Sequence, residues 1–220
     1  MTQHIKHHLD DATLMGYTTG VLPEAFNLIV ATHLSLCDSC RAQAASFEAL
    51  GGEVLEQTKP DAALAPIGKD SLDATFALIE TPQTPSPQPA VAKPGVLPAP
   101  LQAYVGGDLE AVKWRAVGLG VKQAILPTSK NATARLLLIP AGAAMPDHGH
   151  QGTEITMVLK GAFHDEDDYF ARGDVEIADS DMHHTPVADI KEDCICLAVS
   201  DAPLKFSGLI PRIAQRFLRI

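Results

Sequence analysis

The feature that most constrains this fold is a proline-rich stretch near the middle of the chain. Seven of the sixteen prolines lie within residues 81–100, in the sequence TPQTPSPQPAVAKPGVLPAP. Proline has no backbone N–H and fixes its own φ, so such a stretch cannot continue a helix or a central strand. We expect an extended, semi-rigid spacer there. The chain of 220 residues therefore divides into two units of domain size, residues 1–80 and 101–220.

The charge of both parts argues against several kinds of partner. Residues 1–80 carry 4 basic and 11 acidic residues (net −7), residues 101–220 carry 12 and 16 (net −4), and Lys93 in the spacer adds +1, which gives −10 for the chain. A chain this acidic is a poor candidate for binding nucleic acid or an anionic membrane directly. The apolar share of 46% is ordinary for a protein that buries a core.

The first residues and the cysteine count indicate the cellular compartment in which the protein works. No apolar stretch follows the histidines near the N-terminus, and no window is apolar for about 18 residues, so we expect neither a secretory signal nor a membrane span. Four cysteines are too few for a disulfide scaffold. We therefore expect a cytoplasmic protein, in which Cys and His pairs indicate metal or redox chemistry.

Residues 1–80 show helical patterns. Asp10 or Asp11 can cap a helix through Tyr17, and Pro23-Glu24 can open a second. We expect a third from about residue 37 to 49, before Gly51-Gly52, and a fourth over residues 70–80. On the second helix, one face at helical spacing consists of Phe26, Ile29, Val30, His33 and Cys37.

Residues 101–220 show short strands without helices between them. The expected strands are 112–117, 122–126, 134–139, 155–159, 168–171, 175–178 and 194–199. Many short strands at close spacing favour a β-sandwich or barrel. The tail 211–220 fits either a closing strand or a short helix. The expected fold class is multidomain, a small all-α domain followed by an all-β domain.

The helical part holds a candidate zinc site. His33, Cys37 and Cys40 follow the spacing His-x3-Cys-x2-Cys, which places three zinc-type ligands on one side of a helix or helical corner. Structural zinc takes four tetrahedral N or S ligands, so one more is needed. His4, His7 and His8 are candidates. The alternative, a surface CxxC motif of the thioredoxin kind, lacks the surrounding βαβ pattern.

The β part holds a second candidate metal site. His148, His150 and Glu154 stand at i, i+2 and i+6, so an extended chain would place them on one face, although Gly152 favours a turn within the run. His184 follows Gly173 by eleven residues. Three imidazoles and a carboxylate suit Zn, Fe, Mn, Ni or Cu. We expect Zn²⁺ in the helical domain and a second divalent metal in the β domain. Among the candidate metals for that second site, we rank Zn²⁺ ahead of Fe, Mn and Ni.

Cys194 and Cys196 stand at i and i+2 on an expected strand and therefore share a face. Buried free cysteines commonly act as small apolar side chains. The alternative is an oxidant-sensitive pair near the second metal.

The helical part resembles the zinc-binding anti-sigma domain, on the strength of the His-x3-Cys-x2-Cys motif and a histidine about 25 residues upstream. The resemblance implies that the zinc ligands are His8, His33, Cys37 and Cys40. It also implies a helical domain that holds an extracytoplasmic-function sigma factor and covers the surfaces with which the sigma factor contacts RNA polymerase. An acidic domain suits a basic, DNA-binding partner.

The β part resembles the cupin family, whose first motif, G-x5-H-x-H-x3-E-x6-G, is met at every position from Gly142 to Gly161. The second motif, G-x5-P-x-G-x2-H-x3-N, is met at Gly173 and His184. It departs from the family at Asp179, Asp181 and Ala188. The resemblance implies a jelly-roll barrel whose metal ligands are His148, His150, Glu154 and His184, with the register favouring His184 over His183.

Both parts together resemble the ChrR-type anti-sigma factors, including stretches such as VATHLSLCDSC and CICLAVSDAPL. The resemblance implies that the N-terminal domain suffices to inhibit the sigma factor. It implies also that the cupin relieves this inhibition in response to singlet oxygen or related oxidants. We expect a non-enzymatic regulator. The alternatives are a cupin dioxygenase or isomerase with an N-terminal interaction domain, and oxidation of Cys37 and Cys40 with loss of zinc.

Overall fold

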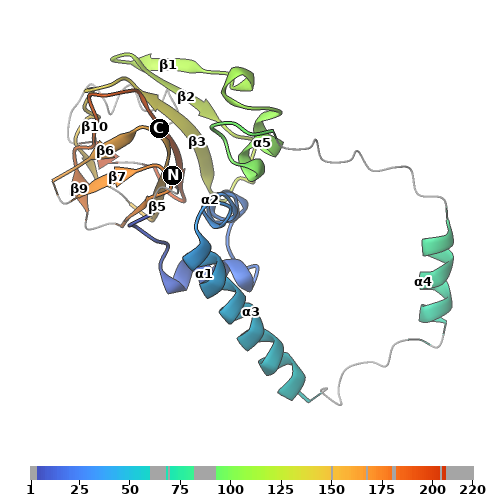
Figure 1. Cartoon of the computed structure of the whole chain (residues 1–220). Coiled ribbons are helices and arrows are strands. Elements are labelled where there is room, and N and C mark those ends of the chain that lie inside the picture. Colours follow the sequence, from blue (N-terminus) through green and yellow to red (C-terminus); the bar gives the residue numbers. More distant parts are fainter. Residues whose placement is uncertain are drawn as a thin grey trace.

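The computed structural model describes residues 4–59, 68, 70–81, 93–149, 151–166, 168–179, 182–203 and 205–206. Helices of the first part of the chain lie against a β-structure formed by the second part (Figure 1). This order of an α-helical part before a β part confirms the predicted fold class. The tail 211–220 and residues 82–92 of the proline-rich spacer lie outside the described residues.

Four helices come from the first part of the chain: α1 (Asp11–Thr18), α2 (Glu24–Leu34), α3 (Asp38–Gln57) and α4 (Ser71–Glu80). Asp10 caps α1, because its carboxylate accepts the N–H of Thr13 at 2.7 Å. Pro23 stands at the N-cap of α2, as expected. Helix α5 (Ala99–Val105) begins within the last residues of the expected spacer and ends at Gly106, whose φ is 84°.

Two helix ends differ from the expectation. Helix α2 ends at Leu34, so Cys37 does not lie on it and instead forms the N-cap of α3. Helix α3 does not end before Gly51-Gly52 but continues to Gln57. A helical glycine costs about 1 kcal/mol relative to alanine, which weakens a helix without ending it when helix formers such as Glu53 and Leu55 follow. The second half of α3 therefore projects beyond the other helices (Figure 1).

The second part forms short strands joined by turns, after the 3-10 turn η1 (Leu109–Ala111). The strands are β1 (Arg115–Gly118), β2 (Val121–Ile125), β3 (Thr133–Ile139), β4 (His148–Gly149), β5 (Glu154–Lys160), β6 (Ala162–His164), β7 (Tyr169–Ala171), β8 (Val175–Ala178), β9 (His183–His184), β10 (Val187–Ala188), β11 (Cys194–Ser200) and β12 (Lys205–Phe206). They form a six-stranded sheet in the order β1-β2-β3-β11-β5-β8 and two three-stranded sheets, β10-β6-β7 and β12-β4-β9. Each pair of neighbouring strands is antiparallel.

The central strands β3, β5 and β11 of the six-stranded sheet are largely buried on both faces, whereas β1 is mostly exposed. Successive side chains of a strand point to opposite faces of the sheet. Leu136, Leu197 and Met157 form one row across β3, β11 and β5 and are fully buried. The row next to it consists of Arg135, Ala198 and Thr156 and lines an internal cavity. The first face therefore packs against the helices, whereas the second belongs to the interior of the β-structure.

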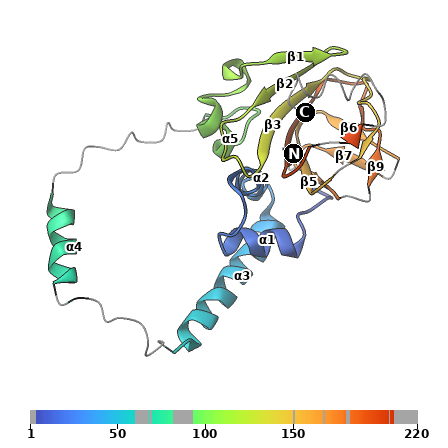
Figure 2. The ribbon, with the colours of Figure 1, turned by 180° about the vertical axis from the view of Figure 1, so that it is seen from behind.

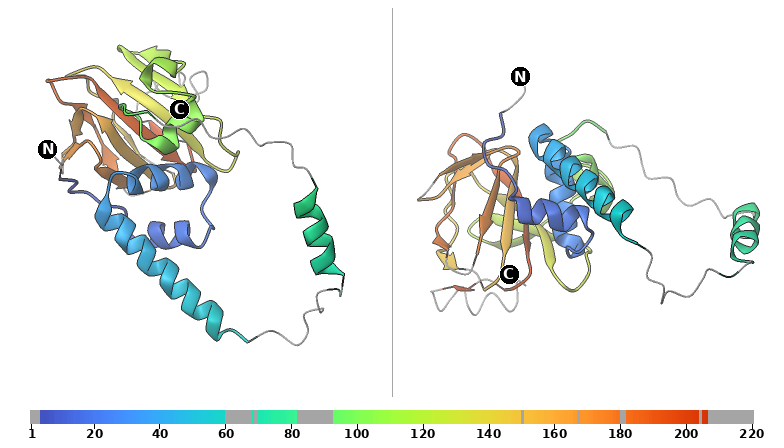
Figure 3. Two further views of the ribbon diagram at one scale, coloured as in Figure 1. Left: turned by 45° about the vertical axis from the view of Figure 1, so that its right-hand side comes forward. Right: turned by 90° about the horizontal axis from the view of Figure 1, so that it is seen from below.

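Helix α2 covers the first face of the sheet. It contacts β11, β5 and β3, and its buried residues Phe26, Ile29 and Val30 belong to the same hydrophobic cluster as Leu136 and Leu197. Figures 2 and 3 show α2 between the sheet and the helices α1 and α3. The helical and β parts thus share one core within the described residues.

Helix α4 stands apart from the rest of the described chain in each view (Figures 1, 2 and 3). None of its residues is buried. Leu72, Phe76 and Ile79 form an apolar stripe at helical spacing on α4 and are 63%, 53% and 68% exposed. An amphipathic helix with an uncovered apolar stripe is a surface suited to a partner.

The shared core leads to a test of coupling between the two parts. Ile29 is fully buried in α2, whereas Trp114, the only tryptophan, packs on the same cluster from the β part. Replacing Ile29 with alanine is expected to lower the free energy of unfolding by about 2–4 kcal/mol. Denaturant unfolding followed by Trp114 fluorescence should report this loss, since one core unfolds as a unit. Val21→Ala, at a position 74% exposed, is the control. If Ile29→Ala leaves the denaturant midpoint of the Trp114 transition unchanged, the helical part and the β part have independent cores.

Candidate metal centres

The first candidate centre is formed where three helices meet. His8 precedes α1, His33 lies in the last turn of α2, and Cys37 and Cys40 lie at the start of α3. One nitrogen or sulfur atom from each of the four lies within 4.8 Å of the others. The structure thus brings together the four residues expected from the resemblance. Only His8 is exposed among them.

The distances in this His2Cys2 cluster fit a tetrahedral zinc ion. Nε2 of His33 lies 3.3 Å from Sγ of Cys40, and Nδ1 of His8 lies 3.3 Å from Sγ of Cys37 and 3.5 Å from Sγ of Cys40. With Zn–N near 2.1 Å and Zn–S near 2.3 Å, a tetrahedral ion separates such atoms by about 3.6 Å. Two thiols and two imidazoles at these separations could hold a metal ion, and they match the donor set typical of structural zinc.

Burial favours the neutral forms of the ligands in this cluster. It lowers the pKa of His33 to about 4, although the hydrogen bond to Gly173 opposes this, so the ring is neutral at pH 7 and able to bind a metal. Burial, together with the hydrogen bond that the thiol shares with Cys37, raises the pKa of the Cys40 thiol to about 11. Such a thiol ionises when a bound metal ion supplies the compensating charge.

The other two N-terminal histidines lie outside the cluster. The ring of His7 packs 4.4 Å from that of Phe170, and its Nε2 is 3.5 Å from the carboxylate of Asp168. The side chain of His4 is exposed. Among the three candidates for the fourth ligand, the structure therefore places His8 with the thiols.

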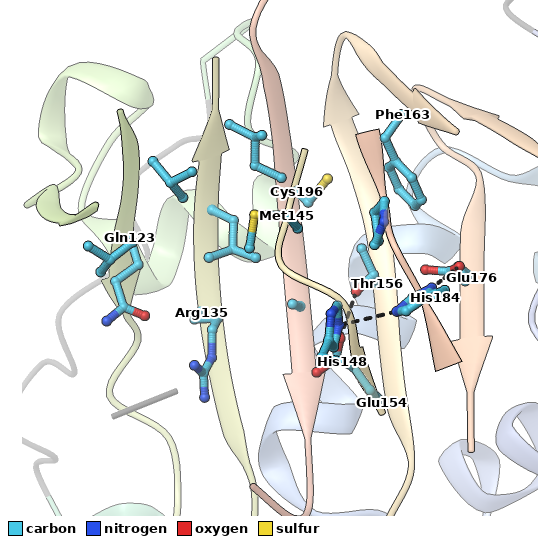
Figure 4. Close-up of a pocket in the computed structure, with 16 residues that line it drawn as sticks. Gln123, Arg135, Met145, His148, Glu154, Thr156, Phe163, Glu176, His184 and Cys196 are labelled. Atoms are coloured by element: carbon cyan, nitrogen blue, oxygen red, sulfur yellow. Dashed lines mark hydrogen bonds and ion pairs between the residues drawn. The ribbon is translucent and has the colours of Figure 1, made fainter. Parts of the chain in front are cut away.

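The second candidate centre lies in a cavity of about 70 Å³ inside the β part. His148 on β4, Glu154 on β5 and His184 on β9 line this cavity (Figure 4). The fourth expected ligand, His150, lies outside the described residues. The run from His148 to Glu154 is not one extended strand, because the chain bends at Gln151-Gly152 between β4 and β5. This bend agrees with the turn expected at Gly152.

The two histidines of the cavity face each other. Nδ1 of His148 lies 2.8 Å from the carbonyl of Pro146, and Nδ1 of His184 lies 3.0 Å from a carboxylate oxygen of Glu176. When both Nδ1 atoms carry their protons toward these oxygens, the two Nε2 atoms meet at 3.2 Å with their lone pairs toward each other. A shared cation stabilises this arrangement, and acceptors behind the Nδ1 atoms are typical of metal-binding histidines.

Carboxylates surround this histidine pair. Burial raises the pKa of Glu154 to about 7, although Arg135 and His184 oppose this. Burial also raises the pKa of Glu176. The pKa of His184 is lowered by burial, but hydrogen bonding and the charges of Glu176, Glu154 and Asp165 together raise it above its usual value. A divalent cation would relieve the repulsion among these carboxylates, so the donor set fits the second divalent metal.

Two donors near His184 have no counterpart in the sequence prediction. Asp165 and Glu176 lie with His184 in a group whose donor atoms are within 4.8 Å of one another. Glu176 could have been found, because it is the one charged residue in the apolar strand Val175–Ala178 and alternation places it inside. Asp165 stands in an acidic run, HDEDD, from which no single member could be selected.

Cys194 and Cys196 lie on β11 and are almost fully buried, with their sulfur atoms 3.5 Å apart. The hydrogen bond with Cys194 and burial raise the pKa of Cys196 well above its usual value. Cys196 lines the same cavity as His148. The pair therefore packs as small apolar side chains beside the second centre, and its redox activity stays a prediction.

The fold and the two candidate centres define a class of protein. It is a cupin with an N-terminal helical extension, and that extension carries a His2Cys2 cluster that could hold a metal ion. The family model described as a ChrR cupin-like domain matches residues 102–204. The anti-sigma-E factor ChrR of Cereibacter sphaeroides is 53% identical over 216 residues, which cover 98% of this chain and 99% of the relative. The chain belongs to the ChrR family of anti-sigma factors.

A solved structure of a complex also supports this family. The crystal structure of Rhodobacter sphaeroides SigE in complex with the anti-sigma ChrR matches with a TM-score of 0.78 and 52% identity, covering 90% of this chain and 100% of that one. An RmlC-like cupin protein of Ralstonia eutropha matches with a TM-score of 0.41 and 25% identity, over 47% of this chain and 71% of that one. In the described residues, no helix combines the length and the apolar character needed to span a bilayer.

Proposed function

We propose that this protein is an anti-sigma factor that sequesters an extracytoplasmic-function sigma factor in the cytoplasm. The observation that carries the proposal is a sequence identity of 52%, in a match that covers 90% of the chain, to a ChrR protein whose structure is known in complex with SigE. The N-terminal helices, held together by zinc at His8, His33, Cys37 and Cys40, would form the inhibitory part. A divalent metal at His148, His150, Glu154 and His184 would occupy the cupin cavity.

The surface proposed for the sigma factor consists of the apolar side chains that the helices leave exposed. They lie on the projecting half of α3 and on α4, and are Leu50, Val54, Leu55, Leu72, Phe76, Leu78 and Ile79. The same helices carry acidic residues such as Glu48, Glu53 and Glu80. Apolar side chains surrounded by acidic residues suit a partner whose DNA-binding surface is basic.

This proposal is tested by mixing the purified full-length chain with the extracytoplasmic-function sigma factors of its source organism, one at a time. One of them should co-elute with it in size-exclusion chromatography and lose its transcription activity with RNA polymerase. If none forms a complex while the protein is folded and holds zinc, the proposed function is wrong.

The cupin part is proposed to gate release of the sigma factor without turning over a substrate. Replacing His148 with alanine is expected to leave inhibition intact, because the residue lies on the cavity side of the sheet, whereas α2 covers the opposite side. The response to singlet oxygen should be lost or strongly weakened. Transcription from a sigma-dependent reporter, with and without a photosensitiser in light, measures both effects.

His164→Ala is the matched control for His148→Ala, since His164 is an exposed histidine at the end of β6. It should respond as the natural protein does. If His148→Ala also responds normally, the metal of the cupin cavity does not sense the signal. Substrate consumption by the metal-loaded protein under oxygen would instead favour a cupin enzyme.

A further inference from the structure

The inference concerns the turn that precedes β8 in the cupin part. Asp174 is only 2% exposed, and one oxygen of its carboxylate accepts the backbone N–H groups of Lys6 at 2.6 Å and His7 at 3.0 Å. The other oxygen accepts the N–H of Ala171 at 2.9 Å. A buried residue of the cupin part therefore fixes the N-terminal segment just before His8.

The neighbouring residue of the same turn holds a second ligand. Nδ1 of His33 donates to the carbonyl of Gly173 at 3.0 Å, while its Nε2 faces the thiol of Cys40. Gly173 has a φ of +93°, and an added Cβ would lie 2.7 Å from the side chain of Ile5. Glycine is therefore required for the carbonyl to point at His33 while Ile5 packs against the turn.

The turn is itself anchored in the β-structure. The N–H of Gly173 donates to Val158 on β5 at 2.8 Å, and the N–H of Val175 donates back to the carbonyl of His7 at 3.3 Å. Both histidines of the His2Cys2 cluster are thus held by one rigid segment of the other half of the chain. His33 is held directly, and His8 through the peptide that precedes it.

We propose that Asp174 and the carbonyl of Gly173 are positioning groups of the zinc site, so that the cupin part supplies the outer shell of the cluster in the helical part. The proposal rests on the proposed zinc site. Partners behind metal-binding histidines fix the ring orientation and typically contribute 10–100-fold in metal affinity. A histidine that lacks such a partner can rotate away from the ion.

This placement also gives the proposed gating a physical route. Glu176 follows Gly173 by three residues on β8 and hydrogen bonds His184 of the cupin cavity at 3.0 Å. A displacement of β8 caused by a change at His184 would therefore reach His33 through the Gly173 carbonyl. The two centres are linked by one short strand rather than by the long spacer.

The test is the rate at which the full-length protein gives up zinc to a chromogenic chelator. Asp174→Asn is expected to release zinc from the Cys-containing site about 10–100-fold faster. With Co²⁺ in place of zinc, the thiolate-to-cobalt absorption should change in intensity or position. Asp108→Asn is the matched control, because Asp108 likewise accepts two backbone N–H groups, of Val96 and Leu97, away from the cluster. It should leave zinc release and the cobalt spectrum unchanged.

A second pair of variants leaves Asp174 intact, in case its replacement prevents folding. Lys6→Pro removes one of the two N–H groups of the N-terminal segment that Asp174 accepts, whereas Lys6→Ala keeps both. Lys6→Pro should accelerate zinc release and Lys6→Ala should not. Equal release rates for Lys6→Pro and Lys6→Ala, or for Asp174→Asn and Asp108→Asn, would overturn the inference. Absence of zinc from the Cys-containing site of the natural protein would instead refute the proposed zinc site itself.

Discussion

Replacement of Cys40 with serine is expected to remove one zinc ion per chain and to abolish binding of the sigma factor. Cys40 is 4% exposed, and its sulfur lies 3.3–3.5 Å from the nitrogen atoms of His33 and His8. Structural zinc sites contribute about 10–16 kcal/mol of apparent binding free energy to folding. A serine hydroxyl is a poor zinc ligand, so most of this contribution should be lost. The junction of α1, α2 and α3 would then lose the link that holds it.

Zinc content, measured by atomic emission, and complex formation in size-exclusion chromatography report the two effects of Cys40→Ser. Cys194→Ser is the control, since it alters a buried thiol on β11 that belongs to a different hydrophobic cluster from Cys40. That variant should keep the zinc of the helical part and the sigma complex. A Cys40→Ser protein that still binds the sigma factor with natural affinity would show that inhibition does not depend on zinc.

The zinc cluster was predictable because its spacing is local. His33, Cys37 and Cys40 lie within eight residues, and the end of α2 and the start of α3 bring them together without help from the rest of the fold. His8 required the resemblance, since the sequence near the N-terminus offers three histidines at similar separations. The structure distinguishes them through Asp168 and Phe170, which engage His7 from the cupin part.

Most of the fold was predictable for the same reason. Helix caps such as Asp10 and short apolar runs such as Ala134–Ile139 and Cys194–Val199 depend on neighbouring residues. Strands of two or three residues, such as β4 and β9, give no periodic signal and were missed. Helix α5 was missed because prolines surround it, although Pro98 and Pro100 stand at the N-cap and second helical position that tolerate proline.

The packing of the two parts on each other could not be predicted. The largely apolar sequences of β3 and β11 indicate that both faces of these strands are covered, but not that α2 covers one of them. The roles of Gly173 and Asp174 depend on contacts across about 140 and 167 residues of sequence, to His33 and His7. A proline-rich spacer indicates separate units, whereas the structure gives the units a common core. Nothing in local sequence records such distant contacts.

The second large effect on sigma binding is expected from a substitution on helix α4. Replacing Phe76 with aspartate should weaken sigma binding by about 2–4 kcal/mol, which corresponds to a roughly 30- to 1000-fold increase in Kd. Phe76 is 53% exposed in the free chain and lies at the centre of the stripe with Leu72 and Ile79. A carboxylate there cannot enter an apolar contact without losing its hydration, and it would add negative charge inside an interface built on apolar anchors. Stability of the free protein should change little, because no described residue of α4 is buried.

Isothermal titration of the sigma factor into Phe76→Asp and Ile190→Asp separates a local effect from a general one. Ile190 is 84% exposed in the turn before β11, so its replacement adds the same charge on the cupin part, away from the helices. Only Phe76→Asp should lose affinity, while both keep the natural zinc content and melting temperature. Equal affinities would mean that α4 does not contact the sigma factor. The proposed sigma-binding surface would then be limited to α3, with its exposed side chains Leu50, Val54 and Leu55.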